Sequence, residues 1–342
     1  MLPLNVAEYE ALAEPRMHPA AWDYYATGTD DEVTLRENQA AFARIWLRPR
    51  MLADVSSVDA ATTVLGTPVS MPILIAPTAM HRFACEEGER ATARAAGAAG
   101  TLMTASTESW CPLEDIASAA TGPLWFQLYV YRSRTFAESL VRRAEAAGFR
   151  AIVLTVDSPR WSRRQRSMRS EAEIPQYWTG NLPEIEGETY DTLVLTWADI
   201  AWLRSLTSLP LVLKGILTAE DATLAVEHGI DGIVVSNHGG RQLDTVPATI
   251  EALPEVVDAV AGHCEVYLDG GIRRGTDALK ALAHGARAVL VGRPILWGLA
   301  VNGEEGARHV LELLHAELEL AMALAGRPTV ASIDRSLARL PK

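Results

Sequence analysis

Eight short apolar runs, each leading into a turn, constrain the fold of this chain more than any other feature of its sequence. The runs are almost continuously apolar rather than alternating, as expected of parallel strands that are covered on both faces. They recur along most of the chain. The expected strands are Pro72–Ala79, Thr101–Ser106, Leu124–Val130, Ala151–Asp157, Pro210–Ile216, Gly232–His238, Glu265–Gly271 and Ala288–Pro294.

The segments between these runs are helical patterns rich in Ala and Leu that stop at glycine. The expected N-caps are Thr135, Thr218 and Thr276, and the helices that follow them end at Gly148, Gly229 and Gly285. Eight strand–helix units in series predict an α/β protein with a (β/α)8 barrel, the TIM barrel. A doubly wound open sheet is the structural alternative, but no Gly-x-Gly-x-x-Gly motif follows the first strand.

We expect a single domain over residues 1–342, with a barrel core at about 70–300. An N-terminal helical arm precedes the first strand, and a Leu-rich amphipathic helix runs from about Glu304 to Ala325. The fourth and fifth strands are separated by an extended loop at about 158–205, which contains the basic stretch Arg160–Arg169. On a barrel, such a loop lies at the catalytic rim and is predicted to act as a mobile lid.

Composition excludes several classes of function. With 342 residues, 49% of them hydrophobic and 22% charged, the chain can fill a large core. The net charge of −12 argues against nucleic-acid binding. The three cysteines are widely separated and the histidines are dispersed, so neither a disulfide framework nor a metal site is expected. Neither a signal peptide nor an apolar run of membrane-spanning length is apparent, so we expect a cytoplasmic protein with no membrane partner.

Polar residues follow the apolar part of every expected strand. In a barrel of this kind, polar residues at the carboxyl ends of strands form the active site. Any one of them alone is more often a hydrogen-bonded structural residue, but their presence on all eight strands favours a site. The candidates are Thr78, Ser106, Gln127, Tyr129, Thr155, Asp157, Lys214, Ser236, His238, Arg241, Asp269, Arg273, Gly292 and Arg293.

The last two strands carry the motifs Asp269-Gly-Gly-Ile-Arg-Arg-Gly and Val291-Gly-Arg-Pro. Barrels frequently bind phosphate after strands seven and eight, where glycines let backbone N–H groups approach an anion. Arg273 and Arg293 would add charge-assisted contacts. Either motif alone fits a tight turn with a surface arginine, but the two together favour a phosphate site.

Lys214 and His238 suggest the chemistry. Lys214 ends an apolar run, where a buried ammonium group requires an anionic neighbour, and a reduced flavin is such a partner. His238 ends the next strand, where its near-neutral pKa suits proton transfer, and Asp157 could orient it. A buried, hydrogen-bonded structural histidine is the alternative.

Six motifs recur at these strand ends, namely Ala76-Pro-Thr-Ala-Met, Phe126-Gln-Leu-Tyr, Leu154-Thr-Val-Asp, Leu213-Lys-Gly, Ser236-Asn-His-Gly-Gly-Arg-Gln-Leu-Asp and Leu268-Asp-Gly-Gly-Ile-Arg-Arg-Gly. Together they resemble the FMN-dependent α-hydroxy-acid oxidase and dehydrogenase family, of which glycolate and lactate oxidases are members. The likeness extends from Tyr24 to the C-terminal helix. It implies FMN as cofactor and a TIM barrel.

The resemblance also implies catalytic roles. His238 is the expected base that takes a proton as the substrate α-carbon delivers its electrons to the flavin, and Asp157 is expected to stabilise the protonated imidazole. Tyr129 should contact the substrate oxygen, and Lys214 should lie at flavin N1 and O2. The implied clamp on the substrate carboxylate consists of Tyr24, Arg164 and Arg241. Carbanion and hydride mechanisms both remain open.

The same resemblance places a further set of residues along the cofactor, from the flavin ring through the ribityl chain to the phosphate. This set is Pro77, Thr78, Ala79, Ser106, Gln127, Thr155, Ser236, Asp269, Gly270, Gly271, Arg273, Gly292 and Arg293. Ala79 resembles the oxidase members, which favours O2 as electron acceptor.

One position departs from the glycolate oxidase pattern, in which a Trp closes the pocket over a small substrate. Glu108 stands at that place, two residues after Ser106. A carboxylate facing the substrate side chain would disfavour an apolar or anionic group and accept a hydrogen bond from a polar or cationic one. The alternative is that Glu108 points to solvent.

The predicted function is therefore FMN-dependent oxidation of an (S)-2-hydroxy acid to the 2-oxo acid, with O2 as acceptor and H2O2 as product. A 2-hydroxy-acid dehydrogenase that passes electrons to a quinone is one alternative. Others are an FMN barrel enzyme acting on a phosphorylated substrate and a flavin-binding protein without turnover. The resemblance also implies a homotetramer.

Overall fold

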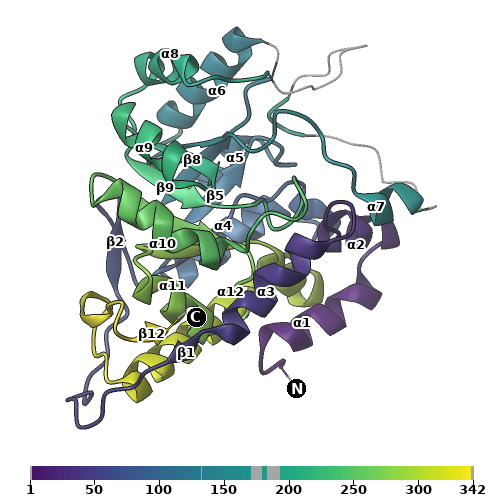
Figure 1. Ribbon diagram of the computed structural model, residues 1–342. Coiled ribbons are helices and arrows are strands. Elements are labelled where there is room, and N and C mark those ends of the chain that lie inside the picture. Colours follow the sequence, from purple (N-terminus) through teal and green to yellow (C-terminus); the bar gives the residue numbers. More distant parts are fainter. Residues whose placement is uncertain (1, 132, 171–178, 183–192, 340–342) are drawn as a thin grey trace.

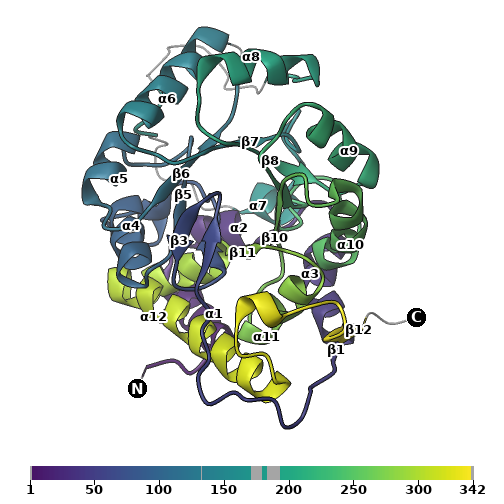
Figure 2. The same ribbon diagram turned by 90° about the vertical axis from the view of Figure 1, so that its left-hand side faces the viewer.

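Eight strands build the centre of the molecule. They are β4 (Ile73–Ile75), β5 (Met103–Ser106), β6 (Leu124–Leu128), β7 (Ile152–Thr155), β8 (Leu211–Ile216), β9 (Gly232–Val235), β10 (Glu265–Asp269) and β11 (Ala288–Val291). In the computed structural model, which describes residues 2–131, 133–170, 179–182 and 193–339, they close into a barrel in the order β10-β11-β4-β5-β6-β7-β8-β9 (Figure 2). All neighbouring strands are parallel. The predicted (β/α)8 barrel is confirmed, and each predicted run contains one barrel strand.

Apolar side chains from alternate strand positions fill the inside of the barrel. Trp125 on β6 and Tyr267 on β10 are fully buried there and meet edge to face, with ring centroids 5.4 Å apart. A hairpin of β2 (Thr62–Val64) and β3 (Thr67–Val69) adds its inward side chains to the same cluster. The hairpin covers the amino-terminal end of the barrel, so a ligand site is left to the carboxyl-terminal end.

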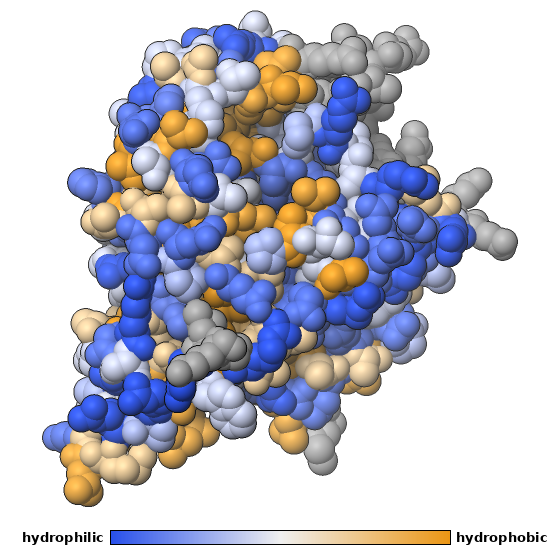
Figure 3. All heavy atoms as spheres, in the orientation of Figure 1, coloured by the Kyte–Doolittle hydropathy of each residue, from blue (hydrophilic) through white to orange (hydrophobic). Residues whose placement is uncertain are grey.

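Helices surround the barrel (Figure 1). They are α4 (Glu89–Ala98), α5 (Leu113–Ala119), α6 (Arg134–Ala146), α8 (Ala198–Leu206), α9 (Ala219–Glu227), α10 (Thr249–Val260), α11 (Gly275–Ala283) and α12 (Arg293–Ala325), with the short 3-10 turns η2 (His81–Phe83) and η3 (Val330–Ser332). Within the described residues, no helix is both long and apolar enough to span a membrane. The face seen in Figure 3 is mainly hydrophilic, in keeping with the net charge of −12.

The helix boundaries differ from the predictions at two N-caps. Thr218 caps α9 as predicted, through a hydrogen bond from the backbone of Asp221. The N-cap of α6 is Ser133 rather than Thr135, because the Ser133 hydroxyl accepts from a backbone N–H of the first turn. Similarly, α11 begins at Gly275 and not after Thr276, since the Asp277 carboxylate accepts from the backbone N–H of Arg274 at 3.0 Å.

The C-terminal helix is longer than predicted. Helix α12 starts at Arg293, directly after β11, and non-helical backbone at Asn302 and Gly303 divides it into two segments. The second segment corresponds to the amphipathic helix predicted from about Glu304 to Ala325. The first segment belongs to the barrel's eighth strand–helix unit.

The predicted N-terminal helical arm is confirmed. It contains α1 (Val6–Ala13), η1 (Glu14–Arg16), α2 (Pro19–Ala26) and α3 (Val33–Arg44), and it is followed by β1 (Trp46–Leu47), which pairs with β12 (Ala338–Arg339). The arm reaches the carboxyl ends of the strands, where the Tyr25 hydroxyl donates to the Met80 carbonyl at 2.5 Å. The backbone N–H of Thr29 donates to Gly240 at 2.9 Å. The arm therefore forms one wall of the site.

The segment between β7 and β8 is only partly the loop that the sequence predicts. Residues 171–178 and 183–192 of the predicted lid lie outside the described residues. A short helix, α7 (Gln165–Arg169), is bound to the arm through Arg166, which donates to Glu32 Oε1 at 2.9 Å. The predicted end of the lid at residue 205 is wrong, because α8 begins at Ala198 and forms part of the helical ring.

Candidate active site

The carboxyl end of the barrel carries a layer of polar side chains that the strand period dictates. Successive side chains of a strand point in opposite directions, so residues two apart face the same side. On β6, Gln127 therefore follows Trp125 into the barrel, and on β8, Lys214 follows Val212. The same spacing on β7, β9 and β10 adds Thr155, Ser236 and Asp269.

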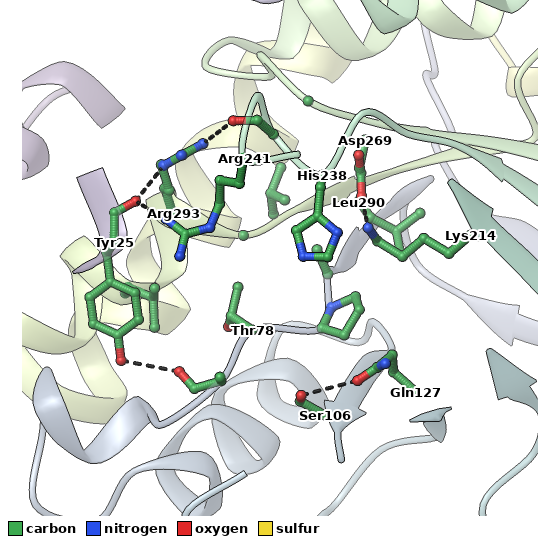
Figure 4. A pocket seen from close by; sticks show the side chains of 18 of the residues that line it. Tyr25, Thr78, Ser106, Gln127, Lys214, His238, Arg241, Asp269, Leu290 and Arg293 are labelled. Atoms are coloured by element: carbon green, nitrogen blue, oxygen red, sulfur yellow. Dashed lines mark hydrogen bonds and ion pairs between the residues drawn. The ribbon is translucent and has the colours of Figure 1, made fainter. Parts of the chain in front are cut away.

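These strand ends and the arm surround one pocket (Figure 4). Most of the residues predicted from the sequence line it. Those lining it are Tyr24, Pro77, Thr78, Ala79, Ser106, Glu108, Gln127, Tyr129, Thr155, Arg164, Lys214, His238, Arg241, Asp269, Gly270, Gly271, Arg273, Gly292 and Arg293. The structure thus brings together residues from the arm, all eight strand ends and the loop after β7.

Two predicted residues, Ser236 and Asp157, stand behind this lining. Ser236 stays a predicted cofactor contact, and its side chain is fully buried in the protein. Its Oγ accepts from Lys214 Nζ at 2.9 Å and from the backbone N–H of His238 at 3.1 Å. Ser236 therefore positions two pocket residues at once.

Lys214 is a buried cation with a matched anion. Its Nζ lies 3.2 Å from Asp269 Oδ2 on β10. Burial by itself lowers the pKa of Lys214, but the charges of Asp269 and Asp157 reverse this effect and raise it. Lys214 therefore carries its positive charge at neutral pH and presents it to the pocket.

His238 lies in a turn of left-handed backbone. Its φ is +59°, and those of Gly239 and Gly240 are +64° and +75°. A histidine rarely adopts this conformation, and such residues persist only where their surroundings hold them. Here Asp157 does so, because its Oδ1 lies 2.9 Å from His238 Nδ1.

The hydrogen bond to Asp157 sets the tautomer of His238. Since a carboxylate only accepts, Nδ1 carries the hydrogen, and Nε2 is left as the basic nitrogen. Nε2 lies 3.4 Å from the hydroxyl of Tyr129, which also lines the pocket. Burial lowers the pKa of His238, although the charge of Asp157 opposes this. The imidazole is therefore neutral at neutral pH and can take up a proton.

Asp157 supplies a fixed negative charge. Burial by itself raises the pKa of this carboxyl, but the interactions with His238 and Lys214 outweigh that effect and lower it. An ionised Asp157 beside a neutral His238 is suited to stabilising the imidazolium once a proton has been transferred.

Two guanidinium groups converge at the arm side of the pocket. Arg241 donates to the carbonyl oxygen of Tyr24 at 2.6 Å, and its guanidinium lies 5.0 Å from the centre of the Tyr24 ring. Burial and the charge of Arg164 lower the pKa of Arg241 to about 10. Like charges held together in a buried place favour a bound anion, and guanidinium groups bind carboxylates well.

The predicted phosphate end also gathers cations. The Arg273 guanidinium lies 4.8 Å from the centre of the Trp297 ring. Arg293 donates to the backbone carbonyls of Tyr25 at 2.7 Å and Gly239 at 2.9 Å. Burial and the charges of Arg241 and Arg273 lower the pKa of Arg293 well below its usual range. An anion bound between Arg273 and Arg293 would relieve this repulsion.

Gly271 has a packing role that the sequence did not reveal. The sequence suggests that it brings backbone N–H groups to an anion. In the structure its φ is +87°, and a Cβ there would lie 1.9 Å from the carbonyl oxygen of Asn38 in α3. The close approach of the arm to the end of β10 therefore requires glycine at this position.

Unpartnered polar atoms show what kind of ligand fits. Among the residues that the structure describes, Asp269 Oδ1 and Arg273 Nε are buried without a hydrogen-bond partner. Buried polar atoms are nearly always paired, so both are expected to bind a ligand. A hydroxylated chain ending in phosphate would offer donors to Asp269 and an anion to Arg273, and Lys214 would supply a positive charge to the electron-rich end of a reduced ring. The pocket therefore fits the expected flavin nucleotide.

Glu108 lines the pocket and does not point to solvent. The hydroxyl of Tyr131 donates to its Oε1 at 2.9 Å. Burial raises the pKa of Glu108, while Tyr131 and the two guanidinium groups of Arg164 and Arg241 oppose this shift. The one departure from the glycolate oxidase pattern thus lies in the site itself.

Sequence reasoning missed two aromatic residues of the pocket, Tyr25 and Trp161. Tyr25 adjoins Tyr24 on α2, and its hydroxyl is bound by the backbone after β4. Trp161 lies in the basic stretch after β7, and its side chain is 54% exposed. A large apolar residue among arginines was the available signal for Trp161.

Known proteins with similar chains share this architecture. Glycolate oxidase 1 of Oryza sativa subsp. indica is 51% identical over 97% of this chain and 94% of its own. The peroxisomal (S)-2-hydroxy-acid oxidase GLO4 of Oryza sativa subsp. japonica is 52% identical over 98% of this chain and 95% of its own. A solved structure of a mandelate oxidase variant with (S)-mandelic acid superposes with a TM-score of 0.94 at 44% identity, covering both chains completely.

A family model gives the same result over almost the whole length. The model of the FMN-dependent dehydrogenases matches residues 13–340, which include the barrel, the C-terminal helix and the arm from the end of α1 onwards. Its cofactor agrees with the flavin nucleotide that the pocket fits. The chain therefore belongs to the FMN-dependent dehydrogenase family.

Proposed function

We propose that the protein oxidises an (S)-2-hydroxy acid to the corresponding 2-oxo acid. The observation that carries this proposal is the position of His238 Nε2, which lines the same pocket as the Arg164 and Arg241 guanidinium groups while Asp157 holds the opposite ring nitrogen. Relatives at about half identity that are named glycolate oxidase and (S)-2-hydroxy-acid oxidase support the same reaction.

Arg164, Arg241 and Tyr24 bind the substrate carboxylate. The charges of both guanidinium groups oppose the rise in the pKa of the Tyr24 hydroxyl that burial causes. All three residues line the same pocket, so the two cations share one end of it. A carboxylate held there by two cations is fixed in position as well as bound. This orientation brings the α-carbon and its hydroxyl towards Tyr129 and His238.

His238 takes one proton from the substrate at Nε2. The ionised Asp157 stabilises the resulting imidazolium, and the Tyr129 hydroxyl contacts the substrate oxygen. The oxidation releases two electrons and two protons from the CH–OH group. FMN, which Lys214, Asp269 and Arg273 would hold, would supply the two-electron acceptor and take up the second proton by either the carbanion or the hydride route.

The final electron acceptor in the proposal is O2. It takes up the two electrons and two protons released by the substrate and becomes H2O2. The similar proteins are named oxidases, and Ala79 lines the pocket, which together support this choice. A homotetramer and a cytoplasmic location also remain proposals. Native mass measurement and fractionation test them.

Anaerobic stopped-flow absorbance tests the proposal. The yellow, FMN-loaded protein is mixed with glycolate, lactate, mandelate and longer or charged 2-hydroxy acids, and bleaching is followed before O2 or a quinone is admitted. We expect bleaching by at least one acid and rapid return of the colour with O2. Bleaching by none would contradict the oxidation, and return only with the quinone would contradict the oxidase assignment.

A further inference from the structure

Glu108 is held firmly at the wall of the substrate pocket. It lies two residues beyond the end of β5, where its backbone N–H donates to Ser106 Oγ at 3.1 Å. Its carbonyl oxygen accepts from the backbone N–H of Met80 at 3.2 Å. Because the backbone N–H and the carbonyl oxygen of Glu108 are both hydrogen-bonded, the backbone fixes the direction of its side chain into the pocket.

The carboxylate has one occupied oxygen and one open one. Tyr131, which is only 5% exposed, donates to Oε1 at 2.9 Å. Among the described residues no hydrogen bond reaches Oε2. Burial and then the charge of Glu108 raise the pKa of Tyr129 and Tyr131, and the same two causes act on Tyr24. The Glu108 carboxyl group therefore faces a space of the pocket that Tyr24 and Tyr129 also line.

This space is where the substrate side chain must lie. The carboxylate end of the proposed substrate is assigned to Arg164 and Arg241, and its α-carbon to His238. The remaining substituent then points towards the other lining residues, which include Glu108 and Trp161. Trp161 is half exposed at the mouth and offers its ring as a cover.

We propose, on the basis of the proposed function, that Glu108 selects 2-hydroxy acids whose side chain ends in a hydrogen-bond donor. A hydroxyl or an ammonium group there donates to Oε2. An apolar side chain would cover this carboxylate oxygen without offering it a hydrogen-bond donor, and a second carboxylate would be repelled. A site with a buried polar group strongly rejects substrate analogues that lack the hydrogen-bonding partner of that group. It discriminates much less between analogues that differ only slightly in size.

A role of Glu108 in substrate selection can be distinguished from a purely structural role. If the carboxylate served only to bind Tyr131 and balance the guanidinium charges, its removal would lower kcat/KM for all substrates by a similar factor. A selecting role changes the ratio between matched substrates instead. The two roles are therefore separated by kcat/KM ratios rather than by activity.

The test measures kcat/KM for isosteric pairs of acids in steady-state turnover of the FMN-loaded protein with O2. The pairs are 2-hydroxybutanoate with glycerate, and 2-hydroxypentanoate with 2,4-dihydroxybutanoate and with 4-amino-2-hydroxybutanoate; malate supplies the anionic case. We expect kcat/KM to be about 10- to 100-fold higher for at least one donor-bearing acid than for its apolar isostere, as for one hydrogen bond to a charged group. Malate should be the poorest.

Two variants at position 108 separate the preference for a hydroxyl donor from the preference for an ammonium donor. Glu108→Leu should abolish the preference and improve the apolar acids. Glu108→Gln, which is nearly isosteric and still accepts from Tyr131, should keep part of the preference for the hydroxyl but lose that for the ammonium. If the Leu variant does not hold FMN, the Gln variant decides.

The outcomes also separate this inference from the proposed function. Equal or higher kcat/KM for the apolar isosteres in the natural protein overturns the selection by Glu108 while leaving hydroxy-acid oxidation intact. An unchanged preference in the variants does the same. Bleaching by no acid at all overturns the proposed function, and the inference with it.

Discussion

His238 is the residue on which the proposed chemistry most directly depends. Replacing it with Ala removes the base but leaves Lys214, Asp269 and Arg273 to hold the cofactor. We expect His238→Ala to stay yellow and to be reduced about 100- to 10,000-fold more slowly by substrate, the usual contribution of a positioned base. Stopped-flow absorbance measures this. His263→Ala, at an exposed histidine beyond α10, is the matched control, and equal rates in the two variants would contradict the role.

The pH dependence of reduction follows from the same residue. Burial lowers the pKa of His238 below its ordinary value of 6.5. The neutral form is the base, so the rate should remain high as pH falls to 6.5 and be lost only at lower pH, as His238 becomes protonated.

Asp157→Asn provides the check on this assignment. It removes the carboxylate that opposes the effect of burial, so the acidic limb of the kcat/KM profile should move to still lower pH while the maximal rate falls. An acidic limb that stays in place would show that another group titrates.

Single residues were predictable where chemistry restricted the choice. His238, Lys214 and Asp157 are costly to bury without a purpose, and the structure brings all three together at the carboxyl end of the barrel. Tyr25 was missed because a buried tyrosine is equally common in a core, whereas Trp161, which is 54% exposed, was missed although it lies among arginines. The bonds of Ser236 to Lys214 and His238 were not predictable, because a serine at a strand end can face a ligand or its protein neighbours.

The strand ends act together as an element, since each contributes one polar side chain to a shared layer. Lys214 is its central cation, paired with Asp269 and bound to Ser236. Lys214→Met should weaken FMN binding by about 10- to 100-fold, in the range of one hydrogen bond to a charged group. Fluorescence titration of the apoprotein measures the change. Lys280→Met, where Nζ donates to Phe42 away from the pocket, is the control, and an equally tight Lys214→Met complex would exclude the cofactor contact.

Among the secondary-structure elements, strands were predicted better than helix ends. Continuous apolar runs leave little choice when both faces are covered. The N-caps of α6 and α11 lie two residues before the predicted threonines, where Ser133 accepts from the N–H of Phe136 and Asp277 accepts from that of Arg274. Which of several capping residues is used depends on where the helix packs.

At the scale of the whole molecule, the pocket joins the arm to the barrel. Arg293 and Arg241 reach across to the arm carbonyls of Tyr25 and Tyr24. FMN bound against these cations should stabilise the arm and barrel together, by about 2.7 kcal/mol at a free concentration 100 times its Kd. Thermal unfolding of the apoprotein with and without FMN measures this. A melting temperature that FMN leaves unchanged would contradict the coupling, and riboflavin, which lacks the phosphate, should stabilise less.

By itself, the sequence determined the barrel, its polar rim and the residue types of the site, because strand period and apolar runs are local properties. Tertiary structure alone decided that the arm packs against Gly271, where a Cβ would not fit, and that Ser236 accepts a hydrogen bond from Lys214. It also decided that α12 begins directly after β11 and that Glu108 faces the pocket beside Tyr131. Such facts depend on contacts between segments far apart in the chain, and no local pattern of residues encodes the direction in which a side chain beyond a strand end will point.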